Sequence, residues 1–290
     1  MNRIKLRSML EQFYLEDIGD KDVSSETIFS KNQQGILTFR AKQPGVFCGR
    51  DIIHEGYGVL DPAVSVQTHV EDGDTIYAGD ILATASGPVQ SLLKGERVVL
   101  NLLQRMSGIA TMTCEAVDKT KNTAARVCDT RKTMPGLRML DKYSVRTGGG
   151  YNHRNGLYDG VMLKDNHISF AGSIKGAVEK VRKEIGHTVK IEVEIETKEQ
   201  LLEAIEAKAD IIMFDNCTPG QIKSWIGLVP NGVETEASGN ITLDNLREYA
   251  ETGIHYISLG CLTHSVKAFD ISARVQIEEL AARGEAYHGA

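Results

Sequence analysis

Apolar and polar residues alternate with two different periods along the chain, and the change of period divides it into two parts. The first part begins with an amphipathic helix and continues with stretches such as GILTFRAK, GVFCG and VSVQTHVEDGDTIYAGDILATASGP. In these stretches apolar residues recur at every second position, and turn signals such as Asp72-Gly73 separate the runs, a pattern typical of an antiparallel sheet with one solvated face. We therefore expect a small α+β sandwich domain over residues 1–110.

A helical segment, ERVVLNLLQRMSGIAT, follows this sheet. Leu102 and Met106 fall on one apolar stripe of the helix, whereas Arg97, Asn101 and Gln104 share the opposite side. This segment leads into the second part of the chain.

Short apolar strands alternate with helical stretches from about residue 124. The expected strands are AARVCDT, GVMLKDN, VKIEVEIE, ADIIMFDN, GVETEASG and HYISLG. A regular alternation of strand and helix indicates parallel strands with right-handed crossovers, and we predict an incomplete TIM-like α/β barrel over residues 111–267. A doubly wound open sheet is the second interpretation, although the chain has neither the Gly-x-Gly-x-x-Gly nor the Walker motif usual in that fold. FDISARVQIEELAARG predicts a last helix over residues 268–285, which would pack on the first domain.

Composition narrows the class of protein without identifying it. The chain has 290 residues, 41% of them apolar, and its net charge of −6 disfavours nucleic acid and anionic membranes as partners. The first residues contain no long apolar stretch, so we expect no membrane segment. We expect a cytoplasmic location instead. The five cysteines are scattered without a Cys-x-x-Cys pair, which predicts neither a disulfide framework nor a zinc site.

Positive charge is concentrated in one segment of this acidic chain. The segment contains Arg126, Arg131, Lys132, Arg138, Lys142, Arg146, Arg154 and Lys164. Such a segment indicates a local anion site, with a solvated charged surface as the alternative.

Each predicted barrel strand ends in polar residues. These endings are Thr130-Arg131-Lys132, Lys164-Asp165-Asn166, Glu194 with Glu196, Asp215-Asn216, Glu236 with Ser238-Gly239, and Gly260. One polar ending is an ordinary helix cap, but six together point to the active-site face that parallel barrels build at their carboxyl ends.

The strand IEVEIE adds a constraint, because alternation places Glu192, Glu194 and Glu196 on the face opposite its isoleucines and valine. These carboxylates would point into the barrel and need cations or sugar hydroxyls as partners. A structural salt bridge to Arg131 or Lys164 is the alternative.

Two further segments carry candidate chemistry. The long stretch between the first two barrel strands contains His153 and Arg154 and the run Gly148-Gly149-Gly150, which would let the backbone approach a ligand closely. Near the end of the barrel, Ser238-Gly239-Asn240 and Gly260 with His264 precede helices, where backbone N–H groups can bind a phosphate.

The chain resembles the quinolinate phosphoribosyltransferases in the order and spacing of many motifs. These are EDIG, ERVVLNLLQRMSGIAT, DTRKTMPGLR, DKY, GGGYNHRNGL, LKDNH, EVEIET, FDN, EASGNI and ISLGCLTHS. Lys21 and Asp141 depart from the family pattern, at positions where no ligand contact is expected. The resemblance implies an amino-terminal sandwich domain, an incomplete barrel and a head-to-tail homodimer, or a larger assembly of it, in which each active site is shared.

The resemblance also assigns roles. It implies that Arg131, Lys132, His153, Arg154 and Lys164, beside Thr130, surround the carboxylates of quinolinate, with Arg97 arriving from the partner subunit. Glu194 and Asp215 would bind the ribose hydroxyls and Mg²⁺, directly or through phosphoribosyl pyrophosphate, and Lys132, Glu194 and Asp215 form the catalytic set. Ser238, Gly239, Asn240, Gly260 and His264 would hold the 5′-phosphate.

The implied reaction joins quinolinate to phosphoribosyl pyrophosphate and releases carbon dioxide, giving nicotinate mononucleotide for NAD biosynthesis without an organic cofactor. Three alternatives remain: a related enzyme acting on nicotinate, a molybdenum-associated paralogue, and a non-catalytic metabolite sensor. The density of cations around His153 and Arg154 favours a dicarboxylate, and the presence of both Glu194 and Asp215 favours an enzyme over a sensor.

Overall fold

The computed structural model describes residues 1–277, which form two compact units. Residues 1–108 and 267–277 make unit 1, and residues 109–266 make unit 2. The division falls within one long helix, α4 (Val89–Lys119). Among the described residues, no helix is both long and apolar enough to cross a membrane.

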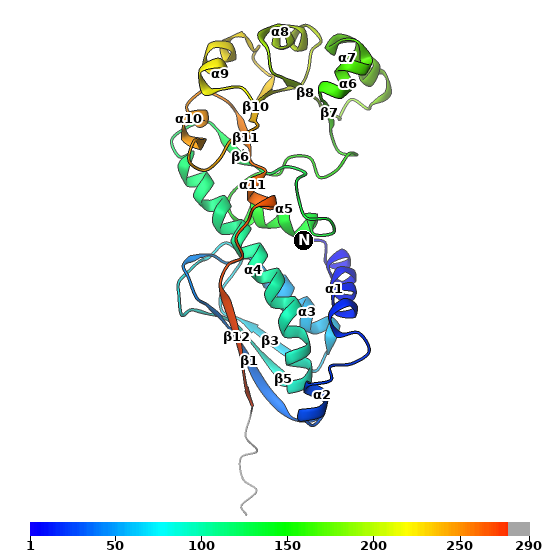
Figure 1. Ribbon diagram of the computed structural model, residues 1–290, viewed down its shortest axis with the longest axis vertical. Helices are drawn as coiled ribbons and strands as arrows, with labels where there is room; N and C mark the ends of the chain where they lie inside the picture. The colour runs from blue at the N-terminus through cyan, green and yellow to red at the C-terminus, as the bar shows by residue number, and fades with distance from the viewer. Residues whose placement is uncertain (278–290) are drawn as a thin grey trace, which may run out of the picture. The chain divides into compact units, whose positions relative to one another are not determined.

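Unit 1 is a four-stranded antiparallel sheet with helices packed on it (Figure 1). The strand order is β12-β1-β5-β3, with β1 (Gln34–Ala41) and β5 (Ile81–Pro88) in the middle. The remaining elements are α1 (Arg3–Ile18), α2 (Ser25–Ile28), β2 (Gly45–Val46), α3 (Arg50–Leu60), β3 (Ser65–Thr68) and β4 (Thr75–Ile76). Leu37 and Phe39 of β1 are fully buried, as are Ile53 and Tyr57 of α3, so the alternating face of the sheet packs against α3.

The expected last helix is wrong over the residues that the structure describes. Ile271–Ile277 form a strand, β12, that pairs antiparallel with β1 from Ala41↔Ile271 to Gly35↔Ile277. The open edge of β1 offers backbone hydrogen bonds, and ISARVQI has β-branched residues at alternate positions, so pairing in the sheet overrides the helical pattern. The rest of the predicted helix, residues 278–285, lies outside the described residues.

Unit 2 is a curved six-stranded parallel sheet in the order β6-β11-β10-β9-β8-β7, which does not close into a full barrel. The strands are β6 (Arg126–Cys128), β7 (Val161–Leu163), β8 (Ile191–Ile195), β9 (Ile211–Asp215), β10 (Glu234–Ser238) and β11 (Tyr256–Ser258). The helices are α5 (Arg138–Thr147), α6 (Asp165–Ala171), α7 (Ile174–Glu184), α8 (Lys198–Glu206), α9 (Pro219–Trp225), α10 (Leu246–Ala250) and α11 (Cys261–His264), and a 3-10 turn spans Ile226–Leu228. All six predicted strands are present, and the incomplete α/β barrel is confirmed.

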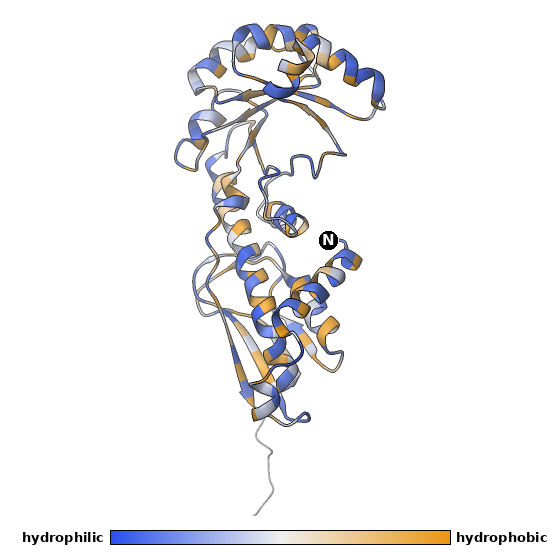
Figure 2. Ribbon diagram, turned by 45° about the vertical axis from the view of Figure 1, so that its right-hand side comes forward, coloured by the Kyte–Doolittle hydropathy of each residue, from blue (hydrophilic) through white to orange (hydrophobic). Residues whose placement is uncertain are grey.

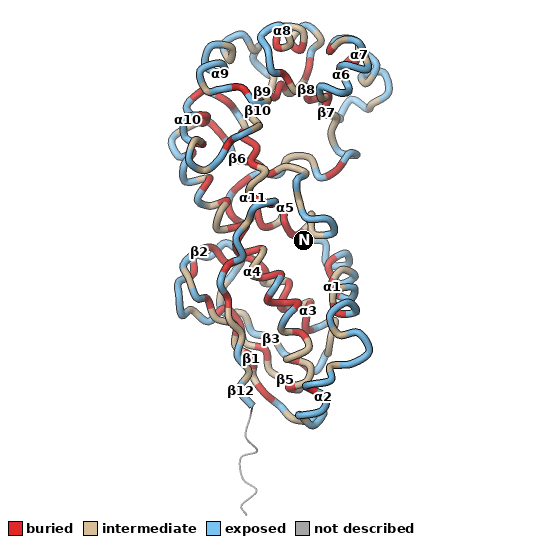
Figure 3. Tube along the Cα trace, viewed as in Figure 1, coloured by how far each residue is buried: buried red, intermediate tan, exposed pale blue. Residues whose placement is uncertain are grey.

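The core of unit 2 lies between the sheet and the helices that cover it. Val193, Ile212 and Phe214 are fully buried and pack with residues such as Leu201 of α8 and Ile222 of α9. The helices over the sheet contain both apolar and polar residues (Figure 2), and buried residues recur along the strands (Figure 3). The apolar face of each strand thus meets helices, which leaves the other face for the interior of the barrel.

Two details of the segment between β6 and β7 differ from the expected ligand-binding loop. The segment contains a helix, α5, and its glycine run packs against α4 instead of lining a cavity. A Cβ atom on Gly148 would lie 2.4 Å from the carbonyl oxygen of Ala110, and one on Gly150 would lie 2.7 Å from Cγ2 of Thr113. The glycines are needed because two pieces of backbone approach each other here, and not because a ligand does.

Candidate active site

A cavity of about 400 Å³ opens at the carboxyl ends of the strands of unit 2. Its lining comes from five strand ends and from the segment after β6: Thr130, Arg131, Lys132, His153, Arg154, Met162, Lys164, Glu194, Met213, Asp215, Glu236, Ser238 and Ser258. Polar strand endings scattered through the sequence therefore meet around one space, as the barrel prediction requires.

One side of this cavity is strongly cationic. Arg131, Lys132 and Arg154 lie on it, and among the described residues no hydrogen-bond partner reaches the buried Nε atoms of Arg131 and Arg154. Burial and the neighbouring charge of Arg131 lower the pKa of Arg154. Two guanidinium groups that line the same cavity favour an anionic ligand that can accept bidentate hydrogen bonds.

A buried ion pair positions the loop that carries His153 and Arg154. Nζ of Lys142, on α5, lies 2.5 Å from Oδ1 of Asp129, and both side chains are almost completely shielded from solvent. The same carboxylate accepts hydrogen bonds from Asn152 Nδ2 at 2.6 Å and from the backbone N–H of His153 at 2.9 Å. Burial raises the pKa of Asp129, while Lys142 and these donors oppose that shift. Asp129 thus ties α5, the end of β6 and the loop together beneath the cationic side.

The acidic side is formed by Glu194 at the end of β8 and Asp215 at the end of β9. Oε1 of Glu194 lies 2.5 Å from Nζ of Lys164, so the salt bridge considered as the alternative does form. Burial is the main cause of the raised pKa values of Glu194 and Asp215, and each is raised further by nearby acidic groups. Asp215 is otherwise contacted by its neighbour Asn216, whose Nδ2 donates to Oδ2 at 2.9 Å.

The carboxylates of Glu194 and Asp215 suit a hard divalent cation. Mg²⁺ prefers oxygen ligands and is usually held by one or two carboxylates together with substrate phosphates. The raised pKa values show that both carboxylates would gain from a nearby positive charge. The donor set therefore fits Mg²⁺.

Small residues and amides lie next to the cavity, at the ends of β10 and β11. Gly239 has a left-handed φ of 87° and lies so close to Asn216 that a Cβ atom would be 2.3 Å from its Oδ1, an atom that also accepts from Asn240 Nδ2 at 2.9 Å. Gly260 packs against the ring of His264 and the side chain of Lys132, where a Cβ atom would be 3.0 Å and 3.1 Å away. Both loops thus bring backbone close to the cavity, which suits a phosphate site.

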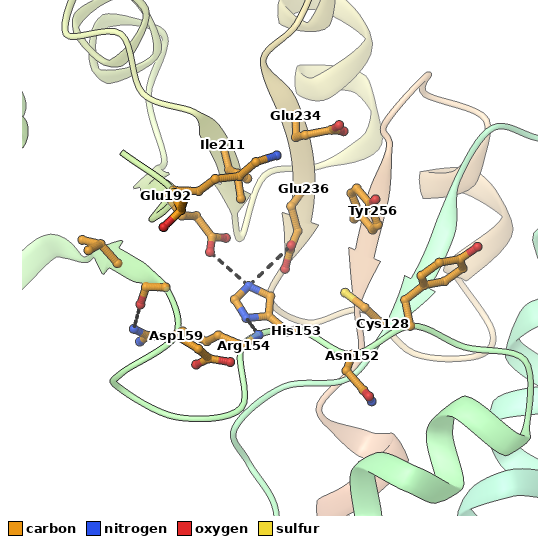
Figure 4. A pocket seen from close by; sticks show the side chains of 15 residues that line it. Cys128, Asn152, His153, Arg154, Asp159, Glu192, Ile211, Glu234, Glu236 and Tyr256 are labelled. Carbon is orange, nitrogen blue, oxygen red and sulfur yellow. Dashed lines mark hydrogen bonds and ion pairs between the residues drawn. The ribbon is translucent and has the colours of Figure 1, made fainter. Parts of the chain in front are cut away.

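A buried trio of side chains, His153, Glu192 and Glu236, forms the floor (Figure 4). Nε2 of His153 lies 3.0 Å from Oε2 of Glu192 and 3.6 Å from Oε2 of Glu236. Burial by itself lowers the pKa of His153, but the hydrogen bond to Glu192 and the charges of both glutamates outweigh it and raise the pKa. Burial and the charge of Glu192 raise the pKa of Glu236 to about 8.

Beyond this floor lies a second cavity, of about 450 Å³. Val161, Ile211, Glu234 and Tyr256, which line it, are the first residues of their strands, so this cavity lies at the amino ends. His153, Arg154 and Glu236 line both cavities. The trio therefore separates two spaces along the interior of the barrel.

The structure brings most of the predicted site residues together. Nine of them line the first cavity: Thr130, Arg131, Lys132, His153, Arg154, Lys164, Glu194, Asp215 and Ser238. Gly239, Asn240, Gly260 and His264 lie at the ends of β10 and β11 without lining it, and Arg97 belongs to unit 1.

Sequence reasoning missed the residues that support the site from below. It gave no role to Asp129 or Asn152, counted Lys142 only as one charge of the basic segment, and counted Glu236 only as one of the polar strand endings. The available signals were Asp129, which comes directly before the basic ending Thr130-Arg131-Lys132, and Lys142, which lies on the apolar side of α5. The helix α5 itself was not predicted.

Comparison with known proteins agrees with this geometry. Residues 22–107 match the family described as quinolinate phosphoribosyl transferase, N-terminal domain, and residues 109–274 match its C-terminal domain. A probable nicotinate-nucleotide pyrophosphorylase [carboxylating] from Bacillus subtilis is 54% identical over 96% of this chain and 96% of its own length. A mitochondrial quinolinate phosphoribosyltransferase [decarboxylating] from Nicotiana glauca is 37% identical over 94% of this chain and 83% of its own.

A solved structure gives the same result for the fold. NadC from Streptococcus pyogenes superposes with a TM-score of 0.92 at 38% identity, covering 96% of this chain and 99% of that one. With both domains matched and relatives of this identity spanning nearly the whole chain, the chain belongs to the quinolinate phosphoribosyltransferase family.

Proposed function

We propose that this protein transfers the phosphoribosyl group of phosphoribosyl pyrophosphate to quinolinate with loss of carbon dioxide. The products are nicotinate mononucleotide and pyrophosphate, and the reaction is a step of NAD biosynthesis. The observation that carries the proposal is one cavity that is lined by both arginines and carboxylates and lies next to two small-residue loops, in a chain of this family.

The cationic side would hold the substrate dicarboxylate. Arg131 and Arg154 present forks with unpaired N–H groups, and Lys132 and Lys164 add charge on either side. Such a set fixes the pyridine ring with its nitrogen directed at the ribose, and the orientation lowers the barrier to attack on C1.

The acidic side would act on the ribose. As the bond from C1 to pyrophosphate breaks, positive charge develops on the sugar, and the carboxylates of Glu194 and Asp215 can stabilise it. Nζ of Lys164 donates to Glu194 at 2.5 Å and opposes the rise that burial causes in the pKa of Glu194. Ser238, Gly239 and Asn240, with Gly260 and His264, would hold the 5′-phosphate through backbone N–H groups.

Glu194 and Asp215 would also hold Mg²⁺, directly or through the pyrophosphate oxygens. When bound, the ion supplies positive charge that stabilises the leaving pyrophosphate. No organic cofactor is part of the proposal. Once the ring nitrogen is quaternary, the electron pair left at C2 by departing carbon dioxide lies beside a positive charge, and a proton then replaces the carboxylate.

The assembly proposed for this enzyme is a homodimer, or a larger oligomer of it, that shares its active sites. In unit 2 the large apolar side chains of Leu157, Tyr158 and Phe170 are exposed, and a partner subunit would be able to cover them. Arg97 of unit 1, whose side chain is 59% exposed, would complete the site of the partner subunit. A cytoplasmic location is also proposed, and cell fractionation tests it.

The test is to incubate the purified protein with quinolinate, phosphoribosyl pyrophosphate and Mg²⁺ and to detect nicotinate mononucleotide and carbon dioxide. Nicotinate replaces quinolinate in a parallel reaction. We expect product from quinolinate alone, and a loss of at least about thirtyfold in turnover for Lys132→Ala, because removing a charged contact that bound substrate shields from water costs roughly 2–5 kcal/mol. Product from nicotinate, or none from quinolinate, would contradict the proposed substrate.

A further inference from the structure

The floor of the substrate cavity holds two buried carboxylates, those of Glu192 and Glu236, with His153 between them and Arg154 beside them. Glu192 and Glu236 are 3% and 4% exposed, and their nearest ligand atoms and Nε2 of His153 lie within 4.8 Å of one another. Among residues 1–277, Oε1 of each glutamate has no hydrogen-bond partner. Two ionised carboxylates buried this close together would be costly, so the trio must hold a proton in addition to the one on a neutral imidazole.

Hydrogen bonds locate this extra proton. The backbone N–H of Arg154 donates to Nδ1 of His153 at 2.8 Å, so the ring carries its single proton on Nε2, which faces Glu192 (Figure 4). Because a second ring proton would have to displace the Arg154 contact, the extra proton belongs on a carboxyl group. Glu192 already accepts from His153 at 3.0 Å, whereas the contact of Glu236 with the ring is 3.6 Å. Glu236 is therefore the group that is protonated.

The surroundings of Glu236 support this assignment. Acidic or neutral titratable groups share its two cavities: Glu192 and Glu194 on β8, Asp215 on β9, Glu234 on β10, Tyr256 on β11, Cys128 on β6, and His153 and Asp159 in the loop. The cations that share them are Arg131, Lys132, Arg154, Lys164 and Lys190. Burial and the charge of Glu192 raise the pKa of Glu236 to about 8, although a hydrogen bond from Ser258 opposes part of that shift.

The same geometry argues against a metal ion in the trio. A metal ion would need the lone pair of Nε2. The backbone N–H of Arg154 donates to Nδ1, so the ring proton lies on Nε2 and this lone pair is not free. The neighbouring guanidinium of Arg154 would also repel a divalent cation.

We propose that Glu236 acts as a neutral carboxylic acid that donates a hydrogen bond to a carboxylate of bound quinolinate. The inference rests on the proposed function, because it concerns how that substrate is held. Glu236 lines the cavity beside His153 and Arg154, on the side expected to receive the carboxylates. An ionised Glu236 would repel a dianion there, whereas the protonated group supplies a donor without adding charge.

The proposal predicts a proton-linked affinity with a definite sign. Glu236 is protonated below its raised pKa and ionised above it, so quinolinate binds best at neutral pH and loses affinity as the pH rises through about 8. The loss attributable to one proton is at most about tenfold for each pH unit. In the wild-type protein near pH 9, binding should take up a fraction of a proton, approaching one for each quinolinate bound.

Calorimetry of quinolinate binding between about pH 6.5 and 9.5, in buffers of different ionisation enthalpy, measures both quantities. Glu236→Gln keeps the size of the side chain and a donor, so we expect affinity within a few fold of wild type at pH 7, no proton uptake and a flatter pH profile. Glu234→Gln is the matched control, because Glu234 lies two residues earlier on β10 and lines only the second cavity. It should retain the wild-type profile.

The outcomes separate the two proposals. Failure of the wild-type protein to bind quinolinate at any pH would remove the proposed function. Binding without proton uptake, equal pH profiles for wild type and Glu236→Gln, or a loss of affinity in Glu236→Gln at every pH would overturn the role of Glu236 alone. A stoichiometric divalent metal that disappears with Glu236→Gln would also overturn it. The wild-type measurement of proton uptake decides the matter even if the variant does not fold.

Discussion

At the scale of single residues, the contact between Asp129 and Lys142 connects α5 to the loop that carries His153. Both side chains are buried, and the carboxylate also fixes the backbone N–H of His153. Removing one partner of a buried ion pair leaves an uncompensated charge, which costs far more than losing an exposed pair. The pair therefore acts on the active site through the loop and not through contact with substrate.

Asp129→Asn should lower the free energy of unfolding by roughly 3–5 kcal/mol, because the ammonium group of Lys142 would remain buried without its counter-charge. Adding Lys142→Met should recover part of that loss. Glu251→Gln is the control, since it breaks an exposed pair with Arg247 and should change stability by about 0–1 kcal/mol. Urea unfolding measures all variants. Equal effects for Asp129→Asn and the control would show that the buried pair does not stabilise the fold.

The sequence predicts the residues that line the cavity better than those that support it. Lys132, Glu194 and Asp215 follow apolar strands, so their position in the barrel repeat is enough to bring them to the same face. Asp129 and Lys142 become partners only when α5 packs beneath the sheet, and no local pattern encodes that contact. The protonation of Glu236 likewise depends on the burial of three groups from different segments.

At the scale of elements, the local sequence pattern predicts the type of an element correctly where that element packs through one face. It fails where pairing with another strand determines the type. The strands of unit 2 are predicted because each is a short apolar run between turn residues. The strand β12 is not predicted, because ISARVQI and the residues after it in the sequence also fit a helical stripe. The strand forms because the edge of β1 that β5 does not occupy is available for pairing. The glycines before Tyr151 were recognised, but their partner, α4, could not be known from spacing.

Gly148→Ala tests the packing of that glycine run. The added Cβ would meet the carbonyl oxygen of Ala110 at 2.4 Å, and neither piece of backbone can move without displacing its neighbours. We expect a loss of roughly 1–3 kcal/mol in the free energy of unfolding. Gly220→Ala, in α9 with nothing within 4 Å of the new Cβ, should be neutral or stabilising. Similar unfolding midpoints for the two variants in urea would mean that the contact with α4 is not tight.

At the scale of the whole molecule, the proposed site takes residues from both units, so it must be asked whether both units belong to the same subunit. Every residue that lines the cavity belongs to unit 2, whereas Arg97 lies on the part of α4 in unit 1. The polar side of α4 that carries Arg97 was predicted from its helical period. The helical period cannot tell whether Arg97 serves its own barrel or the barrel of a partner subunit, because the two subunits of a homodimer have the same sequence.

Mixing two inactive variants distinguishes these cases. Arg97→Ala and Lys164→Ala are each expected to be inactive as pure dimers, because each lacks one cation of every site. If Arg97 acts across the interface, a mixed dimer has one site in which an intact Lys164 meets an intact Arg97, and the other site carries both lesions. Random reassembly of equal amounts should then restore about a quarter of wild-type activity, since half of the dimers are mixed and each has one competent site. If Arg97 serves its own barrel, every site keeps one lesion and the mixture stays inactive. Inactivity in a mixture whose mixed dimers have been isolated through two different tags would therefore remove the shared site and leave Arg97 as a residue of unit 1 alone.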